Sequence, residues 1–167
     1  MENGKKVDVS SLNNVPETML IPLYLKAKET KENGVITDKK AVEIVEQINY
    51  DFSKFEKDWR TQISVAVRTE VFDKILATLT AKNKNLVVVN LGAGLDTREE
   101  RFPNIKWYQL DLPESISIRK TFFTTSKSIT IAKSILDFFW VQSTSGRCFL
   151  PGGNTFEGAF LYHCQIG

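Results

Sequence analysis

Two patterns of apolar and polar residues alternate along this chain. One predicts β-strands and the other predicts amphipathic helices. Short apolar runs bounded by glycine or polar turns predict buried strands over residues 86–91, 105–110 and 128–135. Apolar positions that recur three or four residues apart predict amphipathic helices over residues 15–29, 39–48 and 61–80. The first has Leu20, Leu23 and Ala27 on one side, and Asp38 is placed to cap the second. Pro113 stands at a natural first helical position and predicts another helix, to about residue 122. Strands that alternate with helices are typical of an α/β fold with a parallel sheet.

The helix over residues 61–80 has the clearest pattern. Apolar residues at successive steps of four predict one buried stripe, formed by Ile63, Val67, Val71, Ile75 and Leu79 and widened by Phe72 and Leu76. Arg68 lies on the margin of that stripe. A long basic side chain there either extends its charge to solvent or reaches a fixed anion, and the residue types leave both interpretations open.

The first predicted strand leads into a turn that contains Gly92 and Gly94. Glycine lets the backbone turn tightly and lets a ligand approach the main chain, because it has no Cβ. Asp96 or Thr97 is placed to cap the helical turn that follows. Asp111 ends the next strand, where a carboxylate can accept both hydroxyls of a ribose. These features predict a nucleoside-containing cofactor at the carboxyl ends of parallel strands.

The spacing of the glycines bears on which cofactor this is. A dinucleotide fingerprint has a third glycine that allows close packing of helix against strand, but Thr97 stands at that position. The threonine weakens the case for NAD or FAD and suits a cofactor without a pyrophosphate, such as S-adenosylmethionine. A buried strand followed by an ordinary glycine turn is the alternative.

The resemblance to a known family rests on two motifs, VVNLGAGLDTR at residues 88–98, with Arg101 following, and WYQLDLPE at residues 107–114. Both resemble motifs of the leucine carboxyl methyltransferase family, which includes polyketide-synthesis O-methyltransferases. The resemblance implies a class I S-adenosylmethionine-dependent methyltransferase. Its fold is α/β, a Rossmann-like doubly wound parallel sheet with an N-terminal helical lid, here expected to be incomplete at the C-terminus.

The same resemblance implies roles for individual residues. It matches Arg68 to a family arginine that pairs with the methionine carboxylate of the cofactor, and Asp137 to an acid near the adenine. The residues implied to bind the cofactor are Arg68, Gly92, Gly94, Asp96, Asp111, Leu136, Asp137 and Glu157. A surface cap is the alternative for Asp137, and local ion pairs with the neighbouring acids are the alternative for Arg98 and Arg101. No catalytic residue is identified.

The composition narrows the class of protein. The chain has 167 residues, of which 42% are hydrophobic and 25% charged, as in a globular domain with one sizeable core. A net charge of +2 predicts no attraction to nucleic acid or membranes, and no apolar run reaches the ~18 residues of a membrane span. Cys148 and Cys164 have neither a metal-ligand spacing nor a disulfide framework, which predicts no metal and a reducing cytoplasm.

The pattern changes toward the C-terminus. After Thr121 charged residues become sparse and glycines concentrate, and a Pro-Gly-Gly-Asn run begins at Pro151, where the family would have a buried strand. Residues 157–162 nevertheless resemble a Glu-Gly segment of the family. We expect a chain that is truncated or frame-disrupted after about residue 142. The expected single partial domain has a helical lid over residues 1–60, the first half of the cofactor-binding sheet over 61–141, and an irregular tail over 142–167.

The predicted activity is methyl transfer from S-adenosylmethionine to a carboxylate or hydroxyl of a small molecule or peptide. A carboxylate is already ionised at neutral pH, so its methylation requires no general base. Two alternatives stay open, a catalytically inactive remnant of the family and a nicotinamide-dependent oxidoreductase. A sheet that lacks strands on one side exposes backbone and apolar groups, so we also expect self-association.

Overall fold

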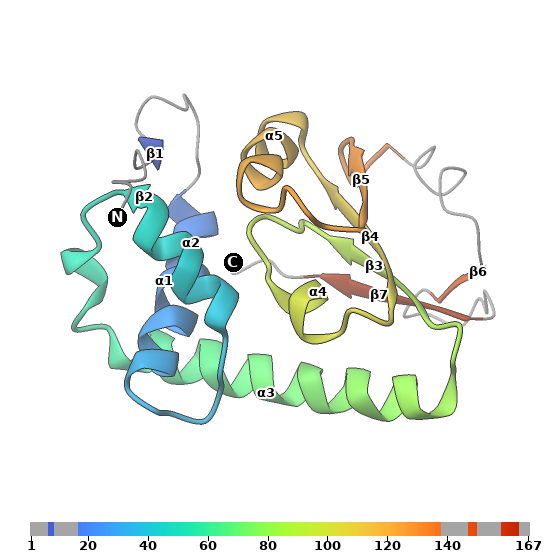
Figure 1. Cartoon of the computed structure of the whole chain (residues 1–167), viewed down its shortest axis with the longest axis horizontal. Helices are drawn as coiled ribbons and strands as arrows, with labels where there is room; N and C mark the ends of the chain where they lie inside the picture. Colours follow the sequence, from blue (N-terminus) through green and yellow to red (C-terminus); the bar gives the residue numbers. More distant parts are fainter. Residues whose placement is uncertain (1–6, 9–16, 138–146, 150–157, 164–167) are drawn as a thin grey trace. The chain divides into compact units, whose positions relative to one another are not determined.

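A computed structural model describes residues 7–8, 17–137, 147–149 and 158–163 of the chain (Figure 1). The chain divides into two compact units, Met1–Lys74 and Ile75–Gly167. The division falls inside one long helix, α3 (Trp59–Lys82), so this helix contributes turns to both units. No helix among the described residues combines the length and the apolar content that crossing a bilayer needs.

The N-terminal unit is mainly helical. Its elements before α3 are β1 (Val7–Asp8), α1 (Glu17–Lys31), α2 (Lys39–Gln47), β2 (Ile48–Asn49) and the short 3-10 turn η1 (Ser53–Phe55). The helix α1 packs against α2, and β1 pairs with β2 in parallel. The apolar side predicted for α1 is confirmed by the burial of Leu20, Leu23 and Ala27. Two of the predicted helices are therefore present, and α2 buries Ala41 and Ile44.

The start of α2 is fixed by the side chain that the sequence predicted. The Asp38 carboxylate accepts a hydrogen bond of 2.9 Å from the Ala41 N–H, which satisfies one of the helix's first free donors. The same carboxylate lies 3.6 Å from the Lys26 ammonium group, and both side chains are buried. Asp38 therefore both caps α2 and neutralises a buried lysine on α1.

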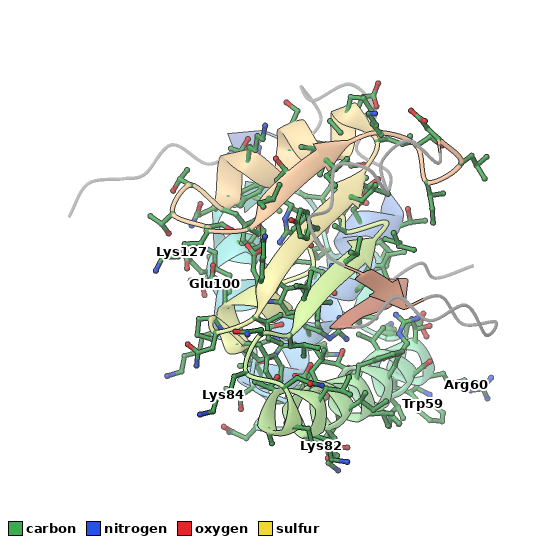
Figure 2. The ribbon with its side chains drawn as sticks, turned by 90° about the vertical axis from the view of Figure 1, so that its right-hand side faces the viewer. Trp59, Arg60, Lys82, Lys84, Glu100 and Lys127 are labelled. Carbon is green, nitrogen blue, oxygen red and sulfur yellow. The ribbon has the colours of Figure 1, made fainter. Side chains whose placement is uncertain are left out.

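The helix α3 is the predicted helix, but it does not bury the predicted face. Four residues of the expected stripe are exposed, with fractions of 53% for Ile63, 48% for Val67, 47% for Val71 and 38% for Ile75. The buried residues of α3 are Gln62, Val65, Ala66, Thr69 and Leu76. Figure 2 shows Trp59 and Arg60, in the first turn of α3, extending away from the helix, and Trp59 is 60% exposed.

The row of apolar residues at steps of four is not the buried row of α3. A step of four residues turns the helix by about 400°, so a row with regular steps of four drifts around its surface. Positions i, i+3, i+4 and i+7 stay on one face, and the buried residues Gln62, Val65, Ala66 and Thr69 have that spacing. Leu76 continues the buried face, whereas Phe72 and Leu79 are half-buried.

The described residues of the C-terminal unit form a five-stranded sheet in the order β5-β4-β3-β7-β6, visible side by side in Figure 1. All of its pairings are parallel. The elements are β3 (Val87–Leu91), α4 (Arg98–Arg101), β4 (Lys106–Asp111), α5 (Pro113–Phe122), β5 (Ile129–Ala132), β6 (Arg147–Phe149) and β7 (Gly158–His163). Parallel strands joined through helices confirm the predicted Rossmann-like α/β fold.

The agreement with the predicted elements is close up to β5 and then fails. The strands β3 and β4 lie within one residue of their predicted limits, and α5 begins at Pro113 as expected. The strand β5 is shorter than the predicted 128–135. Irregular structure was predicted after residue 142, yet β6 and β7 lie there, so that prediction is wrong for those residues. The strand β7 pairs with β3, which is distant in the sequence, and β6 joins the sheet through β7, so local composition does not predict either strand.

The two faces of the sheet differ in chemistry because side chains alternate along each strand. One face carries the apolar cluster of the core, formed by Val89, Leu91, Tyr108, Leu110 and Ile131. The opposite face carries Asn90 and Gln109, which are paired in register on β3 and β4 and are both 1% exposed. Asn90 and Gln109 thus form a buried polar row across β3 and β4, and Asn90 lies two residues before the glycine turn begins.

Candidate functional site

The turn after β3 depends on two residues with positive φ, 66° at Gly92 and 45° at Gly94. An L residue in this region is strained by roughly 1–2 kcal/mol, so glycine is the residue that fits. The N–H groups of Gly92 and Ala93 both donate to the carbonyl of Leu110, at 2.9 and 3.1 Å. These hydrogen bonds fold the turn across the carboxyl end of β4.

The carboxylate at the end of β4 is held by two main-chain donors. The Gly94 N–H donates to Asp111 Oδ2 at 2.7 Å, and the Leu112 N–H donates to Asp111 Oδ1 at 2.7 Å. A carboxylate has about four lone-pair sites, so the group retains acceptor capacity after these two bonds. The glycine turn and the acidic strand end, which the sequence predicted to be neighbours, are in direct contact.

A cavity of about 180 Å³ opens beside this contact. Its lining residues come from the ends of three adjacent strands and are Gly92, Leu110, Asp111, Leu112, Lys133, Ser134, Ile135 and Leu136. The Lys133 N–H donates to the Asp111 carbonyl at 2.9 Å, which brings the segment after β5 alongside. Leu112 and Leu136 are 50% and 79% exposed, so the cavity has apolar side chains at its open side.

Two of the predicted site acids have partners within the protein. The Asp137 carboxylate lies 3.9 Å from the Lys133 ammonium group, and both side chains are partly exposed. The Asp96 carboxylate is buried, accepts a hydrogen bond of 2.9 Å from the Arg98 N–H and forms an ion pair with the Arg98 guanidinium. Of the two predicted caps, Asp96 makes a side-chain bond to the turn, whereas Thr97 makes no cap bond.

Two other predicted site residues are not among the described residues that line this cavity. Arg68 is half-buried on α3, in the N-terminal unit. Glu157 lies outside the described residues. The next residue, Gly158, begins β7, and Ala159 pairs in register with Val87 at the amino end of β3. A strand therefore begins at Gly158. The family resemblance implies instead a strand that ends at the Glu-Gly pair. The cofactor roles of Arg68 and Glu157 stay predictions.

The sequence patterns missed a buried ion pair behind the glycine turn. The Arg119 guanidinium on α5 lies 3.2 Å from the Glu99 carboxylate, and both side chains are almost fully buried. Burial lowers the pKa of Arg119, and the carboxylates of Glu99 and Asp96 act in the opposite direction. A signal for this pair was present, because Arg119 stands three residues from Ile116 and Phe122 on the apolar side of α5.

The fold and this site define a class of protein. A parallel α/β sheet with a glycine turn after one strand and an acid at the end of the next is the arrangement of nucleotide-cofactor-binding Rossmann-like proteins. The chain belongs to the leucine carboxyl methyltransferase family, whose model matches residues 20–134. It is also similar to the tetracenomycin polyketide synthesis O-methyltransferase TcmP of Streptomyces glaucescens, with 28% identity over 116 residues. That match covers 67% of this chain and 43% of TcmP.

Proposed function

We propose that this chain binds S-adenosylmethionine at the carboxyl ends of β3 and β4 and acts in methyl transfer. The observation that carries the proposal is the 2.7 Å hydrogen bond from the Gly94 N–H to the Asp111 carboxylate. This bond places the glycine turn against the acid at the next strand end, and these are the two features beside which Rossmann-like sheets bind nucleoside-containing cofactors. Membership of a methyltransferase family supports the identity of the cofactor.

Two features of the turn favour S-adenosylmethionine over NAD. Thr97 stands where the dinucleotide fingerprint has its third glycine, and it is 0% exposed, so a side chain already fills that space. The helix α4 (Arg98–Arg101) has 4 residues, which gives its N-terminus little of the dipole that a pyrophosphate would use. A cofactor without a pyrophosphate needs neither feature.

Within the proposed site, Asp111 binds the ribose hydroxyls and the turn from Gly92 to Gly94 lies against the nucleoside. The carboxylate is suited to this role because its backbone donors leave acceptor sites free and fix its orientation. Leu112 and Leu136 are largely exposed, and covering them with an adenine ring would remove apolar area from water.

The other predicted residues act at the margins of the proposed site. We assign Arg68, which lies within the residues 20–134 that match the family, to the methionine carboxylate. We assign Asp137, which lies beyond that match, to the adenine, because the residue before it, Leu136, lines the cavity. Asp96 supports the turn through its bonds to Arg98, so its effect on binding is indirect. The role of Glu157 is a prediction, as is that of residues 1–60 as a lid.

The proposed chemistry asks for positioning more than for acid–base catalysis. S-adenosylmethionine, when bound, supplies a methyl group on a sulfonium sulfur. Held by Asp111 and the turn from Gly92 to Gly94, it would supply this methyl group to an acceptor oxygen and would itself become a neutral thioether. The protein contributes by holding donor and acceptor in line and by excluding water. A carboxylate acceptor is already ionised at neutral pH and needs no base from this chain.

We also propose a class of methyl acceptor, self-association of the chain and a location in the cell. The chain spans 43% of the length of TcmP. As the methyl acceptor we propose a carboxylate or hydroxyl group of a small molecule or peptide. We also propose self-association, which the exposed apolar residues support, with Ile129 on β5 43% exposed and Val67 on α3 48% exposed.

The absence of a metal-ligand or disulfide pattern around the two cysteines in the sequence supports a reducing cytoplasmic location.

Isothermal titration calorimetry with S-adenosylmethionine and, separately, with NAD tests the proposal. Micromolar binding of S-adenosylmethionine without binding of NAD is the expected result. Binding of NAD alone would favour the nicotinamide-dependent oxidoreductase and refute the proposal. An assay of methyl transfer from radiolabelled S-adenosylmethionine to carboxylate and hydroxyl acceptors then separates an active enzyme from an inactive remnant that binds the cofactor.

A further inference from the structure

A buried arginine holds the glycine turn from below. The Arg119 side chain is 1% exposed, and one of its terminal nitrogens, Nη1, donates to the carbonyls of Gly94 at 3.0 Å and Asp96 at 2.8 Å. Its other terminal nitrogen, Nη2, lies 3.2 Å from Glu99 Oε1. The guanidinium also stacks on the ring of Phe123, with 4.0 Å from its central carbon to the ring centroid.

The contacts continue into the sheet. Glu99 Oε2 accepts a hydrogen bond of 2.7 Å from Gln109 Nε2, and Gln109 Oε1 accepts one of 3.0 Å from Asn90 Nδ2. Asn90 and Gln109 belong to the buried polar row on the face of the sheet opposite the apolar cluster. A continuous polar chain therefore runs from the middle of β3 and β4, through Glu99, to Arg119.

Burying the Arg119–Glu99 ion pair costs free energy, but it supplies hydrogen-bond donors to the glycine turn. The ion pair with Glu99 and the two hydrogen bonds from Nη1 offset part of the cost of burying this charge, whereas Nε and Nη2 of Arg119 and Oε1 of Glu99 make no hydrogen bond within the described part of the chain. The carbonyls of Gly94 and Asp96 belong to a turn, so no neighbouring strand supplies their donors, and Arg119 supplies both. An apolar side chain of similar size would fill the space but would leave these carbonyls without that donor.

Gly94 is consequently held on both sides. Its N–H donates to the Asp111 carboxylate at 2.7 Å, and its carbonyl accepts from Arg119 at 3.0 Å. With a φ of 45°, the residue has no β-strand or helix to define its conformation. These two hydrogen bonds orient the peptide groups on either side of Gly94, in addition to the bonds of Gly92 and Ala93 to the Leu110 carbonyl.

We infer that Arg119 is a positioning residue for the nucleoside part of the cofactor. By holding Gly94, it keeps the Asp111 carboxylate in the orientation that accepts the ribose hydroxyls. The inference rests on the function proposed above, and it adds a residue on α5 that makes no contact with the cofactor cavity. Arg119 acts through Asp111, so changes at the two positions are coupled rather than independent.

The test is a double-mutant cycle on S-adenosylmethionine affinity, measured by isothermal titration calorimetry on folded protein. Arg119→Met is expected to weaken binding by about tenfold, the equivalent of one hydrogen bond, and Arg119→Lys by about threefold because the ammonium group keeps a donor near the carbonyls. In an Asp111→Asn background the further loss from either change is expected to fall below twofold. Lys120→Met, an exposed cation one residue along α5, is the matched control and keeps wild-type affinity.

The outcomes separate the inference from the proposed function. If the variants melt at lower temperature but keep wild-type affinity, Arg119 is merely structural and the inference is wrong. Full, additive losses in the Asp111→Asn background also refute it. If Arg119→Met does not fold, Arg119→Lys carries the same cycle with its threefold effect, and wild-type affinity in that variant refutes the inference. A wild-type chain that binds no S-adenosylmethionine refutes the proposed function itself.

Discussion

The Asp111→Asn substitution tests the proposed ribose contact with the smallest change of shape. In the wild-type protein both carboxylate oxygens accept a main-chain N–H at 2.7 Å, one from Gly94 and one from Leu112. An asparagine amide has one accepting oxygen and one donating NH₂ group. The Leu112 bond is exposed and the Gly94 bond is partly buried, so we expect the amide to keep its oxygen on Gly94 and turn its NH₂ toward Leu112.

The magnitude follows from the bonds that change. Loss of the exposed Leu112 bond, whose N–H can turn to water, costs about 0.5–1.5 kcal/mol of folding stability. Each ribose hydroxyl would exchange a hydrogen bond to a charged acceptor, worth about 1.5–3 kcal/mol, for a neutral one worth about 0.5–1.5 kcal/mol. Two hydroxyls together give about 2–3 kcal/mol, which corresponds to a loss of roughly 30- to 150-fold in affinity.

Calorimetric titration of S-adenosylmethionine into wild-type and variant protein measures this loss, and thermal denaturation confirms that the variant is folded. Glu114→Gln is the matched control, because it makes the same chemical change at an exposed position on the adjoining helix α5 (Pro113–Phe122). We expect wild-type affinity in the control. A loss of less than threefold for Asp111→Asn in folded protein would refute the ribose contact.

Three further predictions concern the fold. Gly94→Ala places a Cβ on a residue with a φ of 45° and should lower stability by roughly 1–2 kcal/mol in a urea titration, whereas an unchanged midpoint would contradict the observed turn. Asp38→Ala removes a helix cap and leaves Lys26 buried without this carboxylate, so chemical denaturation should show a loss of about 3–5 kcal/mol, and a loss below 1 kcal/mol would argue against the pair. Val71→Lys, at a position 47% exposed, should change the free energy of unfolding by no more than about 0.5 kcal/mol and should reduce self-association in sedimentation velocity. A large destabilisation by Val71→Lys would show that the predicted buried stripe was correct.

The elements that the sequence predicted well are those whose cause is local. The dense run of valines before Gly92 specifies a buried strand, and Pro113 specifies the start of α5, because each acts through its own backbone or its immediate neighbours. Asp38 caps α2 for the same reason. The contact between Gly94 and Asp111 was also predictable, since the carboxyl ends of adjacent parallel strands meet at one edge of a sheet.

The features that the sequence did not predict depend on distant partners. Both faces of α3 carry apolar residues, and which one is buried depends on what packs against it, so Ile63 and Val67 were placed on the wrong side. Arg119 meets Glu99 only after α5 has folded back over the turn. The pairing of β7 with β3 joins segments about 70 residues apart, and such pairing is not encoded in local composition.

The central claim is that two neighbouring strand ends, a glycine turn and a carboxylate, bind one nucleoside. A crystal structure of this chain with S-adenosylmethionine tests it most directly. The account predicts that the ribose hydroxyls lie within hydrogen-bond distance of the Asp111 carboxylate and that the adenosine occupies the cavity beside Gly92. Well-ordered cofactor bound elsewhere on the chain, with that cavity empty, would contradict it.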